Sequence, residues 1–308
     1  MALREDVFDG LAGDPRRFPS QYLYDARGAF LFEKICTTPE YYPTRTEIAI
    51  LRRHLPEIAD LVGPGALVIE PGSGSGQKTQ HLLEALAEPA GYAPIDISCE
   101  QLELFANDLR AAYPTLEVLP VCADFTGDYE APHCSSPARR RMIFFPGSTI
   151  GNFGPDEAIT VLRGLADHLD DRGCALIGVD LKKDASILEP AYDDAQGYSR
   201  EFALNILVRL NRELDATFRT DRFGYEAPYN ASLGRIEMAL VSRAGQTVLI
   251  DGEPVHFDHD ERVVTEYSYK YDLREFAELC ARAGLELVVS WTDPDRLFGV
   301  VYLERAGA

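Results

Sequence analysis

The residues best suited to chemistry begin with a glycine-rich stretch at 70–76, which reads Glu-Pro-Gly-Ser-Gly-Ser-Gly. Glycines let the backbone adopt positive φ angles and approach a ligand closely. Asp96 follows twenty positions after the last of these glycines, and its carboxylate could accept hydrogen bonds from both hydroxyls of a ribose. Asp124 and Phe125 offer a carboxylate for an exocyclic amine and a ring for a purine face. Together these residues predict a site for a ligand that contains adenosine.

Each of these residues also has a simpler explanation. The glycines could form a structural tight turn, Asp96 could be a carboxylate at a helix N-terminus, and Phe125 could belong to the core. The three features nevertheless follow three successive strands. Ligands bind at the carboxyl ends of strands in open α/β sheets, so their joint placement favours a binding site.

A second polar pattern lies at 263–271, where the sequence reads Val-Val-Thr-Glu-Tyr-Ser-Tyr-Lys-Tyr. In a strand, successive side chains point to opposite faces. One face then carries Glu266, Ser268 and Lys270, and the other face carries the three tyrosines, which we expect to pack in a core. The polar face is either ordinary solvent surface or the wall of a polar pocket.

The elements that must position these residues are short apolar runs that alternate with helical stretches. Such alternation predicts βαβ units and an α/β fold with a doubly wound sheet. A capping box, in which Ser98 is followed by Gln101, predicts the start of the second helix. The predicted strands are 66–70, 92–96, 116–122, 141–145 and 174–180, and the predicted helices are 77–88, from 98 onward, and 155–169.

The alternation stops after Asp180 and returns in the last forty residues. The intervening block contains a helix around Arg209 and Arg212, with strand-like stretches at 235–241 and 246–250. The C-terminal part then predicts a helix at 273–283 and strands at 285–291 and 298–303. A block that interrupts an α/β sheet before its closing strands is most simply a substrate-binding insertion.

The composition excludes several classes of function. Among 308 residues, 30 basic and 50 acidic side chains give a net charge of −20, so neither nucleic acid nor a membrane is an expected partner. There is no run of roughly 18 apolar residues and no secretory signal. The histidines lack metal-ligand spacing, so no metal is expected. Five of the six scattered cysteines are interpreted as small core residues of a reduced, cytoplasmic protein, which we expect to be a monomer.

The acidic-x-Gly-x-Gly-x-Gly spacing resembles that of class I S-adenosylmethionine-dependent methyltransferases. A dinucleotide fingerprint would instead need Gly or Ala at the position of Gln77. Longer motifs resemble one family, the histidine Nα-methyltransferases of ergothioneine biosynthesis. The resemblance runs from about 15 to 303 and rests on stretches at 23–28, 32–33, 39–47, 70–79, 145–153, 180–184 and 265–268.

The resemblance implies a fold, a reaction and a domain plan. Members of the family trimethylate the α-amino group of L-histidine with three molecules of S-adenosylmethionine, which gives hercynine. The implied fold is a class I methyltransferase domain with a second, α+β, substrate-binding domain. The methyltransferase domain would comprise 47–182 and 271–308, and the substrate-binding domain would comprise 1–46 and 183–270.

The resemblance also implies roles for individual residues. The cofactor site would comprise Gly72, Lys78, Asp96, Asp124 and Phe125. The substrate carboxylate would be held by Asn152 and Tyr192, and the imidazole would be recognised by Glu266 and Ser268 in a pocket that Met238 lines. The residues nearest the reacting amine would be Tyr24, Tyr41 and Gly147.

Without the resemblance, several of these residues would have ordinary structural roles. Asn152 could form an Asx-turn, Tyr192 could be a surface aromatic residue, and Lys78 could be a solvated helix residue. Tyr24, Tyr41 and Met238 could be core residues.

The implied reaction is an in-line displacement in which the amine attacks the methyl carbon. A held near-attack geometry can contribute about 7–11 kcal/mol. The sequence offers no His or Lys that must act as a general base, so tyrosine hydroxyls and ordered water are expected to orient the amine. Gly147 has no side chain and would leave room for a growing dimethylamine.

Three alternatives remain open on the sequence alone. A methyltransferase of this fold could act on another amino acid, although Glu266 with Met238 favours histidine. A protein that binds S-adenosylmethionine without catalysis is disfavoured by the complete amine-positioning set. A nicotinamide oxidoreductase is disfavoured by Gln77.

Overall fold

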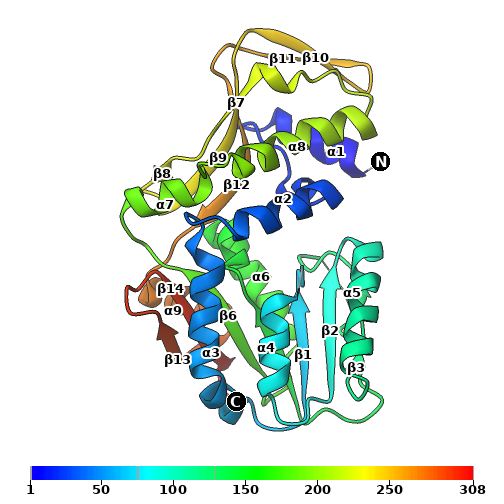
Figure 1. The fold of residues 1–308 in the computed structure, drawn as a ribbon, viewed down its shortest axis with the longest axis vertical. Coiled ribbons are helices and arrows are strands. Elements are labelled where there is room, and N and C mark those ends of the chain that lie inside the picture. The colour runs from blue at the N-terminus through cyan, green and yellow to red at the C-terminus, as the bar shows by residue number, and fades with distance from the viewer. Residues whose placement is uncertain (1, 75, 128, 308) are drawn as a thin grey trace. The chain divides into compact units, whose positions relative to one another are not determined.

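The computed structural model describes residues 2–74, 76–127 and 129–307. The chain divides into two compact units. The sheet unit consists of Pro43–Lys182 and Lys270–Ala308, and the insertion unit consists of Met1–Tyr42 and Lys183–Tyr269. Figure 1 shows both units, and the strands it labels β1, β2, β3, β6, β13 and β14 belong to the sheet unit.

In the described part of the sheet unit, eight strands form one mixed sheet in the order β13-β14-β6-β5-β1-β2-β3, with β4 also paired to β2. The central strands are parallel, and β14 runs antiparallel to both β6 and β13. This arrangement confirms the predicted doubly wound α/β fold. The strand bounds are Ala66–Pro71 (β1), Gly91–Asp96 (β2), Glu117–Val118 (β3), Val121–Cys122 (β4), Arg140–Phe145 (β5), Cys174–Asp180 (β6), Leu285–Thr292 (β13) and Phe298–Arg305 (β14).

The strand order reverses beside β1, because β2 lies on one side of it and β5 on the other. Such a switch point opens a crevice at the carboxyl ends of the strands, where doubly wound proteins bind their ligands. The glycine-rich stretch follows β1, and the stretch that begins at Pro146 follows β5. The topology therefore brings both stretches to the same edge of the sheet.

Helices of the sheet unit pack on the sheet through apolar stripes. Leu51 of α3, Leu82 of α4 and Leu109 of α5 join one hydrophobic cluster with Val68 and Phe144 of the central strands. Val68 and Phe144 lie on the same face of the sheet, because alternate side chains of a pleated strand point to the same face. The helix bounds are Tyr42–Val62 (α3), Gln77–Ala85 (α4), Cys99–Ala112 (α5), Thr149–Asn152 (η2, one 3₁₀ turn), Pro155–Asp167 (α6) and Leu273–Arg282 (α9).

The insertion unit is α+β. Strands β12, β9 and β7 pair antiparallel in that order, β8 pairs with β9, and β10 and β11 form a hairpin. Helix α2 packs against α8, and Asp25 caps α2 by accepting a hydrogen bond from the Gly28 N–H at 2.9 Å. The element bounds are Ala2–Ala12 (α1), Ser20–Leu23 (η1), Ala26–Cys36 (α2), Ala185–Tyr192 (α7), Tyr198–Glu213 (α8), Thr220–Arg222 (η3), Phe223–Glu226 (β7), Tyr229–Asn230 (β8), Arg235–Ser242 (β9), Gln246–Ile250 (β10), Glu253–Phe257 (β11) and Arg262–Tyr269 (β12).

Two predictions about local structure were wrong. Ser98 does precede α5, but its side chain makes no capping hydrogen bond; instead, Asp96 Oδ1 accepts from the Ser98 N–H at 2.9 Å. The prediction that the three tyrosines of 263–271 pack in a core was wrong for two of them, because Tyr267 and Tyr269 are only partly buried, whereas Tyr271 is 6% exposed. The Arg235 guanidinium stacks on Tyr267, 3.7 Å from the ring centroid, and donates to the Tyr269 hydroxyl at 2.6 Å.

The opposite face of the same segment is the more buried one. Ser268 is 4% exposed, and Lys270, to which the sequence assigned no role, is 1% exposed. Its ammonium lies 2.7 Å from Asp180 Oδ2, and neither side chain reaches solvent. Ser268 and Lys270 are therefore interior, and the Lys270 charge is tolerated there because Asp180 offsets the cost of its burial.

Candidate active site

The glycine-rich stretch leaves β1 in a conformation that its glycines permit. Gly72, Gly74 and Gly76 have φ angles of +67°, +51° and +65°. At Gly76, which precedes α4, an added Cβ would lie 2.1 Å from the Phe105 ring, so only glycine fits there. Ser75 lies outside the described residues. The stretch thus exposes backbone at the switch point, as a close-binding ligand requires.

Glu70, the acidic residue that opens this stretch, is buried within β1 and is 2% exposed. Its Oε2 accepts hydrogen bonds from the Thr79 hydroxyl at 2.5 Å and from the Tyr92 hydroxyl at 2.6 Å. Burial raises the pKa of Glu70 to about 7, although both hydroxyl donors oppose the increase. Glu70 therefore ties the start of α4 to β2 and carries a proton at mildly acidic pH.

Asp96 and Asp124 stand at the ends of neighbouring strands. Asp96 ends β2, and Asp124 follows β4, which pairs with β2. Asp124 Oδ1 accepts from the Thr126 N–H at 2.8 Å and from its hydroxyl at 2.6 Å, which fixes the turn. Phe125 makes edge contacts with Phe145 and Phe153, and its ring lies 3.5 Å from where a Gly72 Cβ would stand.

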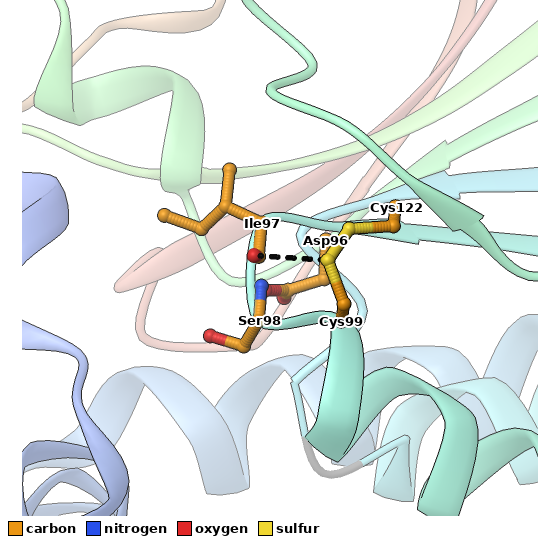
Figure 2. The surroundings of a disulfide bond; sticks show 5 residues. All are labelled: Asp96, Ile97, Ser98, Cys99 and Cys122. Carbon is orange, nitrogen blue, oxygen red and sulfur yellow. Dashed lines mark hydrogen bonds between the residues drawn. A yellow bond between two sulfur atoms is a disulfide. The ribbon is translucent and has the colours of Figure 1, made fainter. Parts of the chain in front are cut away.

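A disulfide between Cys99 and Cys122 joins the segments that carry these two aspartates (Figure 2). Both cysteines are exposed, so the expectation that nearly all cysteines are reduced core residues was wrong for this pair. Only Cys174 and Cys280 are buried among the free cysteines of the described chain. The pairing depends on β2 and β4 being neighbours, which their separation in sequence does not reveal.

Lys78 and Gly147 meet through a residue to which the sequence assigned no role. The Lys78 ammonium lies 2.5 Å from Glu47 Oε2, and the Gly147 N–H donates to both Glu47 oxygens, at 3.1 and 2.9 Å. Glu47 is 1% exposed. Gly147 has a φ of +81°, and an added Cβ would lie 3.3 Å from Lys78 Nζ.

Asn152 ends η2, the turn that follows Gly147. Ser148, which precedes this turn, has a φ of +57°, a conformation that a residue with a side chain adopts only when its surroundings hold it. Its Oγ accepts from the Asp180 N–H at 2.9 Å. The Asp180 carboxylate is in turn paired with Lys270, so this buried ion pair supports the turn that carries Asn152.

The insertion unit brings together the two predicted imidazole-binding residues and two tyrosines. The Tyr24 hydroxyl hydrogen-bonds the Glu266 carboxylate, and burial together with that carboxylate raises the pKa of Tyr24 well above its usual value. The Tyr192 hydroxyl lies 2.8 Å from Ser268 Oγ. Met238 of β9 is 7% exposed and lies opposite Glu266 in the strand register.

The remaining tyrosines of this cluster are held by their neighbours. The Tyr41 ring makes an edge contact with Tyr192 at 6.0 Å between centroids. The Tyr225 hydroxyl donates to the Tyr192 carbonyl at 2.7 Å. Burial, followed by the nearby carboxylates of Asp193 and Glu266, raises the pKa of Tyr225. The insertion unit therefore gathers Tyr24, Tyr41, Tyr192, Met238, Glu266 and Ser268, whereas Gly147 and Asn152 belong to the sheet unit.

The described residues contain neither a group suited to a metal ion nor a helix suited to a membrane. No group of His, Cys, Asp and Glu side chains among them could hold a metal ion. No helix among them is long and apolar enough to cross a membrane.

The doubly wound sheet, the glycine-rich stretch at its switch point and the acidic residue that ends β2 form a ligand site typical of open α/β folds. The sequence matches the family described as "Histidine-specific methyltransferase, SAM-dependent" over residues 3–305. The chain belongs to this family and is an enzyme that uses S-adenosylmethionine.

Three relatives illustrate the range of the family. A "Histidine N-alpha-methyltransferase" of Mycolicibacterium smegmatis is 39% identical over 97% of this chain and 94% of its own length. "Ergothioneine biosynthesis protein 1" of Neurospora crassa is 35% identical over 90% of this chain and 32% of its own. A "4-dimethylallyltryptophan N-methyltransferase" of Epichloe festucae var. lolii is 30% identical, with coverage of 93% and 90%.

Sequence reasoning missed the roles of Glu47, Glu70 and Tyr225. Glu47 and Glu70 lie in the stretches 39–47 and 70–79, whose resemblance to the family was recognised, but neither stretch signals that a carboxylate is buried. Tyr225 lies in a short strand that carried no motif. Their partners are distant in sequence, so only the folded chain identifies them.

Proposed function

We propose that this protein trimethylates the α-amino group of L-histidine with three molecules of S-adenosylmethionine and so produces hercynine, in the first step of ergothioneine biosynthesis. The observation that carries the proposal furthest is the polar face of β12. There Glu266 and Ser268 are paired with tyrosine hydroxyls inside a largely buried aromatic cluster.

The imidazole is the part of histidine that this polar face suits. Glu266 can accept from a ring N–H, and Ser268 can bond the other ring nitrogen. A substrate with an apolar side chain would leave the Glu266 carboxylate without that partner, at a cost of several kcal/mol if it is desolvated. Met238, beside Glu266 in the strand register, supplies an apolar wall.

The residues of the sheet unit fit S-adenosylmethionine, which supplies a methyl group activated by its sulfonium. Asp96 would accept from the ribose hydroxyls, and Asp124 with Phe125 would hold the adenine. The backbone at Gly72 and the Lys78 ammonium would face the amino-acid end of the cofactor. Gly72 supports this assignment, because its positive φ favours glycine and the absence of a Cβ lets a ligand approach its backbone closely.

Tyr24, Tyr41 and Gly147 are proposed to position the amine. Because the pKa of Tyr24 is raised, its hydroxyl stays protonated at neutral pH and donates to Glu266, so its oxygen would accept from the amine N–H. Asn152 and Tyr192 would bind the substrate carboxylate. The amine would pass its proton to water, and the absence of a side chain at Gly147 would accommodate the added methyl groups.

A second candidate substrate is a tryptophan-type amino acid, because one relative at 30% identity carries that name. The charged Glu266 argues against a mainly apolar ring. We also propose that the protein acts as a cytoplasmic monomer on small molecules; the mass in solution at working concentration, measured by light scattering, tests the oligomeric state.

The purified protein should be incubated with S-adenosylmethionine and a panel containing L-histidine, L-tryptophan and other amino acids. Mass spectrometry should detect histidine with one, two and three added methyl groups. Histidine left unmodified beside a methylated competitor would overturn the proposal. Glu266→Ala should reduce histidine use far more than cofactor binding, and Glu253→Ala, on the exposed strand β11, serves as the matched control.

A further inference from the structure

Glu47 is an ionisable side chain in a position where a carboxylate is costly. It is 1% exposed, and burying an unpaired charge is strongly unfavourable. Its two oxygens accept from the Gly147 N–H, and one of them pairs with the Lys78 ammonium at 2.5 Å. Both partners of the carboxylate in these contacts, Lys78 and Gly147, have roles in the proposed reaction.

The three segments that meet at Glu47 are distant in sequence. Glu47 lies in α3, Lys78 lies in the first turn of α4 after the glycine-rich stretch, and Gly147 follows β5. Lys78 would face the cofactor, and Gly147 would face the amine. The carboxylate therefore fixes the spacing between the cofactor side and the amine side of the switch point.

The neighbouring strand β6 leaves room for this carboxylate. At Gly178, an added Cβ would lie 2.0 Å from Glu47 Oε1. The overlapping atom is the end of the Glu47 side chain, which could move away only by giving up its contacts with Lys78 and the Gly147 N–H. The glycine in an otherwise apolar strand thus has a steric reason, which is the presence of Glu47.

We propose that Glu47 is a positioning residue that aligns the donor methyl with the amine and balances the charge of Lys78. The proposal rests on the proposed function. Small misplacements of reacting groups can cost about 10²-fold in rate, so the later transfers, to bulkier amines, should depend most on this alignment. S-adenosylmethionine carries one more positive charge than the product S-adenosylhomocysteine, and the Glu47 charge should therefore favour the former.

The test compares Glu47→Gln, Glu47→Ala and Lys78→Met with the wild type, and uses Glu57→Gln, an exposed residue of the same helix, as control. Calorimetry measures the Kd of S-adenosylmethionine and of S-adenosylhomocysteine. Glu47→Gln keeps an acceptor for Gly147 but loses the charge, so it should weaken S-adenosylmethionine about threefold or more relative to S-adenosylhomocysteine. Lys78→Met should shift this ratio in the opposite direction.

Product distribution supplies the second readout. Glu47→Ala should accumulate mono- and dimethylhistidine, with kcat for the third transfer reduced about tenfold or more. If both ligands weaken equally in Glu47→Gln and the methylation pattern is unchanged, Glu47 is only structural and the proposal is overturned. Absence of histidine methylation by the wild type would overturn the proposed function, while the ligand ratio would still test Glu47.

A separate observation concerns the Cys99–Cys122 disulfide, which lies beside the proposed adenosine-binding residues. Cys99 is three residues after Asp96, and Cys122 is two residues before Asp124. Their Cα atoms are 5.1 Å apart, within the range that disulfides span. Figure 2 shows the bond joining Cys99, at the start of α5, to Cys122 of β4, the strand that pairs with β2, with Asp96 close by. Both cysteines are exposed and therefore accessible to small thiols.

We infer that this pair is a thiol–disulfide modification site that adjusts cofactor affinity. Two molecules of a low-molecular-weight thiol reduce the bond: the first thiolate attacks one sulfur, and the second releases the mixed disulfide. The products are two protein thiols and one small disulfide, so the electron pair passes from the small thiols to the protein. The closed bond preorganises Asp96 and Asp124, and preorganisation raises affinity.

Calorimetry of the whole protein with and without dithiothreitol tests this inference. Reduction should raise the Kd of S-adenosylmethionine about threefold or more. The double variant Cys99→Ser with Cys122→Ser should match the reduced wild type and should not respond to the reductant. Cys134→Ser, which alters a free cysteine, should retain the response. An identical Kd in oxidised and reduced protein would overturn the inference.

Discussion

Glu70 allows a quantitative prediction about pH and stability. Its carboxyl group is buried in β1, and burial raises its pKa from 4.5 to about 7 in the folded protein. The folded state therefore holds a proton on Glu70 over a pH range in which the unfolded chain has lost it. A group with a raised folded pKa contributes stability that is fully present below its unfolded pKa and is lost as the pH rises through the folded pKa.

The size of this effect follows from the two pKa values. They differ by roughly 2.5, and each pKa unit corresponds to about 1.4 kcal/mol. Ionisation of Glu70 should thus lower the free energy of unfolding by about 3 kcal/mol between pH 4.5 and pH values above 7. The hydrogen bonds from Thr79 and Tyr92 are already included in this value, since both lower the pKa.

The assay is urea unfolding of the wild type and of Glu70→Gln at several pH values across this window. Glutamine still accepts from the two hydroxyls but cannot ionise, so the wild type should lose stability relative to the variant as the pH rises. Glu84→Gln, an exposed change in α4, should follow the wild type. Parallel curves for the wild type and Glu70→Gln would refute the reasoning.

Three further predictions concern other buried or bridging groups. Lys270→Met should lower the free energy of unfolding by about 3–5 kcal/mol because Asp180 is left as an unpaired buried charge; urea unfolding checks this, and adding Asp180→Asn should recover part of the loss. Tyr225→Phe removes the donor to the Tyr192 carbonyl and should raise the KM for histidine several-fold at an unchanged cofactor Kd, as measured by steady-state kinetics and calorimetry. Reduction of the disulfide, which closes 23 residues, should cost about 3 kcal/mol in unfolding experiments with and without dithiothreitol.

The strands and helices of the sheet unit could be predicted because their signals are local. Apolar runs bounded by glycine or proline indicated β1, β2, β5 and β6, and the structure confirms them within one or two residues. The stretch 116–122 is an instructive exception. Pro120 cannot donate to a strand ladder, and the stretch divides into β3 and β4 around it.

In the candidate site, too, some features could be predicted from local sequence and others could not. The glycine-rich stretch, Asp96 and Asp124 could be predicted because each follows its own strand, and parallel strands deliver their carboxyl ends to one edge. The face of β12 that is buried could not be predicted. Alternation separates two faces, but only the packing of the insertion unit decides that Ser268 is buried and that Tyr267 stacks on Arg235.

By itself, the sequence determined the α/β class and the ends of most strands of the sheet unit. Each of these depends on neighbours along the chain. The tertiary structure alone decided which charges are buried in pairs, as with Lys270 and Asp180 or Glu47 and Lys78, and which cysteines meet. Those partners are far apart in sequence, and a buried charge is tolerated only where folding brings its counter-charge within hydrogen-bonding distance.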